Sequence, residues 1–145
     1  MPISRWLLPA LVLIPMPACA DTLDRSHPAD AIDTHGAEHY VWGGANEGWY
    51  LAKNANLTVI QERVVPGGEE ISHYHRKARQ FFYVLSGELH LRADGYDNVV
   101  KAGQGIEIAP GKIHQATNPG SQPLDILVIS SPDSHSDRVE ARAVE

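Results

Sequence analysis

The sequence predicts an all-β fold with little helix, arranged as an antiparallel sandwich or barrel. Eight short segments rich in apolar and β-branched residues follow one another at close spacing, and turn sequences such as Asp94-Gly95 and Pro110-Gly111 separate them. Downstream of the N-terminal apolar run, no window keeps a helical period of apolar residues over three turns. A chain of this length fits one domain with one core.

The first 20 residues have the pattern of a secretory signal peptide. Arg5 precedes an apolar run at 6–14, which is too short to span a bilayer, and small residues stand at Ala18 and Ala20. We therefore expect cleavage after Ala20 and an exported protein, periplasmic or secreted, with no membrane segment left. A retained anchor and lipidation at Cys19 are disfavoured alternatives. Cleavage would remove the only cysteine, so no disulfide is expected.

Composition divides the rest of the chain into three parts. Residues 21–39 are polar, carry three histidines without strand or helix spacing, and are expected to form a flexible arm. Residues 40–132 should form the barrel, and residues 133–145 a polar C-terminal tail without an assigned role. The formal charge of −6, from 12 basic and 18 acidic residues, argues against a nucleic-acid partner.

The expected strands begin with 57–65, which is rich in β-branched residues and ends at Pro66-Gly67-Gly68. Seven more follow, each bounded by a turn, at 71–75, 80–86, 88–92, 99–101, 105–108, 113–118 and 124–130.

Two histidines on one of these strands suggest a metal site. Residues two apart in a strand face the same side, so His73 and His75 project together and Tyr74 projects away. Two imidazoles on one strand face can share a metal ion. In isolation, such a pair more often binds nothing.

The surroundings of this pair form a two-part pattern. The first part reads G-x5-H-x-H-x4-Q-x6-G from Gly67 to Gly87, and the second reads G-x6-P-G-x2-H-x3-N from Gly103 to Asn118. Together they resemble the two motifs of the cupin family, and the stretches at 48–50, 79–85 and 134–138 are similar to one branch of small single-domain cupins. The resemblance implies a double-stranded β-helix, also called a jelly-roll barrel, in which His73, His75 and His114 hold a divalent metal.

The chain departs from the cupin pattern at Gln80, which stands where the family has glutamate. A neutral carboxamide is a weak ligand, so Gln80 is expected either to be a loose fourth ligand or only to form hydrogen bonds inside the barrel. Three neutral imidazoles leave open positions on the metal, which could be iron, manganese, zinc, nickel or copper.

Strand alternation extends the prediction from Gln80 to its neighbours. Phe82 and Val84 share its face and should line the substrate cavity, whereas Phe81, Tyr83 and Leu85 point outward. These outward side chains need a cover, which could be the second sheet, the segment at 42–51 or another subunit. We expect a homodimer.

The expected function is that of a metal-binding cupin acting on a small molecule, and a mononuclear metal dioxygenase is the first hypothesis. No general base is evident in the inferred cavity, because Gln80 replaces the glutamate. The alternatives are a non-catalytic periplasmic module that binds metal or a small molecule, and an isomerase or sugar-modifying enzyme. The family name implies a fold rather than a reaction.

Overall fold

The structure is a computed structural model that describes residues 30–141. The predicted signal peptide, its cleavage site and residues 21–29 of the predicted arm lie outside these residues. Within the described part, no helix is long and apolar enough to span a membrane.

The described residues form eleven strands, with no helix among them. In chain order these are β1 (Glu38–Trp42), β2 (Asn46–Asn54), β3 (Leu57–Val64), β4 (His73–His75), β5 (Arg79–Ser86), β6 (Glu88–Ala93), β7 (Tyr96–Lys101), β8 (Gly105–Ile108), β9 (His114–Thr117), β10 (Leu124–Ser131) and β11 (Arg138–Glu140).

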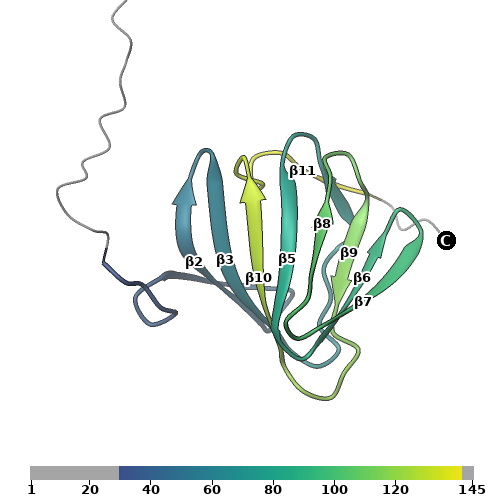
Figure 1. The fold of residues 1–145 in the computed structure, drawn as a ribbon, viewed down its shortest axis with the longest axis horizontal. Coiled ribbons are helices and arrows are strands. Elements are labelled where there is room, and N and C mark those ends of the chain that lie inside the picture. Colours follow the sequence, from purple (N-terminus) through teal and green to yellow (C-terminus); the bar gives the residue numbers. More distant parts are fainter. Residues whose placement is uncertain (1–29, 142–145) are drawn as a thin grey trace, which may run out of the picture. The chain divides into compact units, whose positions relative to one another are not determined.

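The strands make two antiparallel sheets. One has six strands in the order β1-β2-β3-β10-β5-β8, and the other has five in the order β11-β4-β9-β6-β7 (Figure 1). From β3 onward the chain passes repeatedly from one sheet to the other, and neighbouring strands are seldom neighbours in sequence. This winding is that of a double-stranded β-helix, and it confirms the fold class expected from the sequence.

The apolar core lies between the two sheets. Its largest fully buried side chains come from both, including Phe82 of β5, Leu89 and Leu91 of β6, and Ile126 of β10. Alternation explains their burial, because every second residue of these strands faces the opposite sheet.

All eight predicted strands are present, with ends shifted by up to three residues. Three strands, β1, β2 and β11, were not predicted. Each carries many polar or exposed residues and gives little alternation signal. For β1 and β11 the reason is their place as the outer strands of their sheets. The described part of the expected polar tail thus belongs to the barrel, because β11 pairs with β4.

The outer face of β5 carries Phe81, Tyr83 and Leu85, as the alternation predicted. Their exposed fractions are 38%, 37% and 42%, so no part of the described chain covers them fully. The segment at 42–51 does not shield them, because it comprises the end of β1 and most of β2, toward the far edge of the same sheet.

Candidate metal centre

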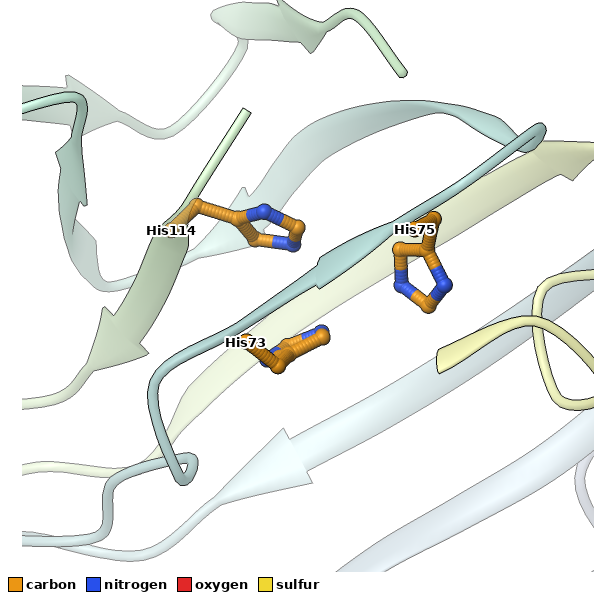
Figure 2. A group of neighbouring side chains, drawn as sticks. All are labelled: His73, His75 and His114. Carbon is orange, nitrogen blue, oxygen red and sulfur yellow. The ribbon is translucent and has the colours of Figure 1, made fainter. Parts of the chain in front are cut away.

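Three buried histidines meet on two neighbouring strands. His73 and His75 stand at the two ends of β4, and His114 begins β9, directly opposite His73 in the strand pairing. Figure 2 shows the three rings grouped in one small space. One nitrogen from each ring lies within 4.8 Å of the others, which is close enough for a shared metal ion.

Each imidazole is held by a hydrogen bond from its Nδ1 atom. His73 Nδ1 lies 2.8 Å from the carbonyl oxygen of Ile71, and His114 Nδ1 lies 2.9 Å from that of Lys112. His75 Nδ1 lies 3.0 Å from a carboxylate oxygen of Asp137. A carbonyl or carboxylate oxygen can only accept, so Nδ1 carries the proton in all three rings. The lone pair of each neutral ring is therefore on Nε2.

Burial keeps these rings neutral. It lowers the pKa of His73 to about 3 and that of His114 to about 4, and in His73 the neighbouring His114 adds to the effect. Burial also lowers the pKa of His75, although the bond to Asp137 acts in the opposite direction. Neutral imidazoles are the form that binds metal ions.

The Nε2 atom of His75 provides a direct test of the metal interpretation. It is buried and has no hydrogen-bond partner. A buried acceptor without a partner costs free energy, and a metal ion at this point would satisfy it. The donor set, which comprises three neutral nitrogens with fixed tautomers, therefore fits a divalent metal such as zinc, iron, manganese or nickel.

Gln80 lies beside the triad and is buried. Its Oε1 atom is 2.9 Å from Nε2 of His114, and its amide nitrogen donates to Ser130 Oγ over 3.2 Å. Because His114 carries its proton on Nδ1, this arrangement turns two lone pairs toward each other. A cation bound by both atoms would remove the repulsion, and so would an amide turned to donate to Nε2.

A cavity of about 280 Å³ opens on His73, His75 and Gln80. Its apolar wall comes from Trp42, Ile60, Ile71 and Val128. Phe82 and Val84 face inward with Gln80, as predicted, but they lie in the apolar core and not among the lining residues. Phe82 instead packs edge-on against His114, with ring centroids 5.9 Å apart.

Three carboxyl groups, those of Glu62, Glu69 and Glu70, line the same cavity, which corrects the expectation that it holds no general base. Glu62 is buried and accepts a hydrogen bond of 2.7 Å from the hydroxyl of Tyr40. Burial raises the pKa of Glu62, and the nearby Glu70 raises it further. Burial also raises the pKa of Glu70, against the lowering effect of Arg138. Carboxyl groups of this kind can exchange protons near neutral pH.

The residues before and within β11 reach the triad, although no role was predicted for them. The carboxylate of Asp137 accepts from His75 and from the backbone N–H groups of Lys77 and Ala78. Nη1 of Arg138 lies 3.0 Å from Nε2 of His73. The C-terminal segment is therefore part of the site.

Glu62 is a site residue that was not predicted, although the sequence carries a signal for it. Thr58, Ile60, Glu62 and Val64 share the inner face of β3, so a carboxylate interrupts an otherwise apolar or small series. Asp137 and Arg138 lie in the stretch at 134–138 that resembles one branch of cupins, but no periodic pattern placed them at the site, because their position depends on the pairing of β11 with β4.

The comparisons with known proteins agree with this geometry. Residues 61–130 match the family described as the cupin domain. The chain is a small cupin-domain protein. The match spans the triad and Gln80, and it confirms the resemblance noted in the sequence.

Solved cupin structures superpose on most of the chain. An RmlC-like cupin from Shewanella frigidimarina is 26% identical, covers 75% of this chain and 96% of its own, and has a TM-score of 0.66. KdgF from Halomonas sp. is 15% identical, covers 75% and 98%, and has a TM-score of 0.68. A cupin-superfamily sugar phosphate isomerase from Silicibacter pomeroyi is 19% identical, covers 77% and 92%, and has a TM-score of 0.64. At this identity the last two likenesses establish the fold alone.

Proposed function

We propose that this cupin is a divalent-metal-dependent enzyme that transfers a proton on a small organic substrate, as an isomerase does. The observation that carries the proposal is the position of Glu62. Its carboxyl group, bonded to Tyr40, lines the cavity that also exposes two of the three histidines. A metal ion and a proton-exchanging group then face the same bound molecule.

The metal ion and the side chains around it would have different roles in such a reaction. A divalent metal at the three imidazoles would act as a Lewis acid on a substrate oxygen. Glu62 in its ionised form would accept a proton from the hydroxyl-bearing carbon next to the polarised carbonyl group, and would return a proton to the carbonyl carbon. The hydroxyl proton of the substrate would pass to the former carbonyl oxygen, so that a new carbonyl group forms at the neighbouring carbon. Tyr40 keeps its proton, because burial and the Glu62 charge raise its pKa, so it holds Glu62 by donation. The apolar wall limits water.

The experiment is hydrogen exchange with solvent. Metal-loaded protein is incubated in D₂O with a panel of sugar phosphates, hydroxy acids and keto acids, and proton NMR follows the loss of one C–H signal or the appearance of an isomer. Glu62→Gln should slow this exchange by about 100-fold or more while metal content stays unchanged. Glu88→Gln is the control, because Glu88 is 48% exposed and is not among the cavity-lining residues.

An oxygenase is the second candidate, and the ligand set favours it. The three imidazoles carry no charge, and Gln80 supplies no carboxylate, so a bound iron would keep open positions. Iron-loaded protein should then consume oxygen with a diketone, catechol or thiol, and Glu62→Gln should leave this uptake intact. If metal and ligand bind but neither reaction occurs, the protein is a binding module.

We also propose that the mature protein functions outside the cytoplasm, on the basis of the N-terminal sequence pattern. N-terminal sequencing of protein recovered from a periplasmic extract should begin at Asp21.

A further inference from the structure

The guanidinium group of Arg138 lies at the face of the triad where ligands would bind. Nη1 is 3.0 Å from Nε2 of His73, and Nη2 donates to the carbonyl oxygen of Ile71 over 3.1 Å. Arg138 opposes His75 in the pairing of β11 with β4, so the strand that carries two metal ligands also positions this cation.

Arg138 has no carboxylate partner among residues 30–141. Three other arginines, Arg63, Arg79 and Arg92, each form an ion pair with an aspartate or glutamate, whereas no carboxylate in the described chain lies within 4.0 Å of Arg138. A guanidinium group has five N–H donors in a planar fork, and these two contacts leave donors available to the cavity that the side chain lines.

The contact with His73 and metal binding exclude each other. Nε2 of His73 has one lone pair, which cannot accept from Nη1 and bind a metal ion at once. A divalent cation would also repel the guanidinium group. When the triad holds a metal, Nη1 must therefore turn away from His73, and the fork remains at the cavity with a donor released.

We propose that Arg138 binds the carboxylate of a small hydroxy acid or keto acid whose adjacent oxygen is held at the triad. The inference rests on the proposed function and names its substrate class. A planar carboxylate matches the guanidinium fork in two parallel hydrogen bonds. A cavity of about 280 Å³ suits one small acid, since it is at the low end of ligand pockets.

The other charged groups in the cavity favour a carboxylate over a phosphate. Glu62, Glu69 and Glu70 line the same space, and Glu62 and Glu70 interact electrostatically with Arg138. A phosphate monoester near neutral pH carries nearly two negative charges, whereas a carboxylate carries one, so repulsion from the three glutamates penalises phosphate more.

The test is ligand binding to the zinc-loaded protein, followed by ¹H–¹⁵N NMR. Lactate is the probe, lactamide is its uncharged counterpart, and inorganic phosphate is the competing oxyanion. Arg138→Gln should weaken lactate binding by about 10- to 100-fold and leave lactamide binding unchanged. Arg138→Lys keeps the charge without the fork and should show an intermediate loss. Arg79→Gln is the matched control, because Arg79 is 53% exposed and pairs with Glu107.

Zinc affinity, measured by chelator competition, distinguishes a direct loss of lactate binding in Arg138→Gln from a loss caused by weaker metal binding. It should be unchanged or higher in Arg138→Gln, because a competing cation is removed. Equal lactate affinity in the wild type and Arg138→Gln would overturn the inference, and so would tighter binding of phosphate than of lactate through Arg138. If lactate binding depends on Arg138 but no proton exchange occurs with any substrate, only the proposed reaction fails.

Discussion

The hydroxyl of Tyr40 donates a 2.7 Å hydrogen bond to Glu62, and the two side chains meet across Gly48. Gly48 of β2 pairs with Tyr40 of β1 on one side and with Glu62 of β3 on the other. A Cβ atom on Gly48 would overlap the Tyr40 ring. The missing side chain thus allows an aromatic ring to cross the middle strand and reach a buried carboxyl group.

Gly48→Ala should displace Tyr40 and break this hydrogen bond. Overlap in a packed region costs about 1–3 kcal/mol, so we expect the free energy of unfolding to fall by that amount in urea titrations. Gly36→Ala is the control, because a Cβ there would meet only Asp33 Oδ1 at 3.9 Å. Equal losses in the two variants would show that Tyr40 does not depend on Gly48.

Glu62 should make the stability of the metal-free protein fall as pH rises. Burial raises its pKa in the folded state above the unfolded value. Between these two values the folded protein keeps a proton that the unfolded chain has released, so the free energy of unfolding decreases with pH by at most about 1.4 kcal/mol per unit. Glu62→Gln should remove this slope.

Urea titrations at intervals from pH 5 to pH 8, with chelator present, measure the difference between wild type and Glu62→Gln. The buried histidines have lowered pKa values and therefore add stability as pH rises, but they do so in both proteins. A constant difference across this range would contradict a raised Glu62 pKa.

Asp137→Asn should weaken metal binding by about 10- to 100-fold, because the carboxylate fixes the tautomer of His75. Asparagine could accept from His75 with its oxygen only by turning its NH₂ group toward the backbone N–H groups of Lys77 and Ala78. Chelator competition with zinc measures the change. Asp97→Asn, at a side chain 73% exposed, should leave zinc affinity unaltered.

Gln80→Glu should tighten metal binding if residue 80 is a ligand, because a carboxylate adds negative charge next to His114. Zinc titration of wild type, Gln80→Glu and Gln80→Leu gives the comparison. Unchanged affinity in both variants would mean that Gln80 only forms hydrogen bonds with His114 and Ser130.

The outer face of β5 should mediate a homodimer. Phe81, Tyr83 and Leu85 expose apolar area in one row, and the half-buried Leu127 and Ile129 of the paired strand β10 lie beside it. Light scattering at micromolar concentration should give twice the chain mass of the mature protein, and Tyr83→Asp should give a monomer. Val99→Asp, on the other sheet, should remain dimeric. A monomeric wild type would refute the prediction.

The sequence patterns predicted an antiparallel sandwich or barrel with eight of the strands, and the resemblance to the cupins implied the double-stranded β-helix and a metal site at His73, His75 and His114. The strand prediction depends on local rules: alternation places His73 and His75 on one face, and glycine and proline mark the turns. His114 was added by the resemblance to the second cupin motif. The inward orientation of Gln80 and Phe82 follows from the same alternation, although Phe82 proved to be core and not cavity wall.

Only the tertiary structure decided which other groups reach the site. Asp137 lies 62 positions from His75 along the chain, and Arg138 lies 65 from His73. Their contacts depend on an outer strand, β11, whose polar residues carry no periodic signal. Tyr40 reaches Glu62 only because two further pairings align β1, β2 and β3. Local periodicity determines which way a side chain faces, whereas pairing between distant segments determines what it meets.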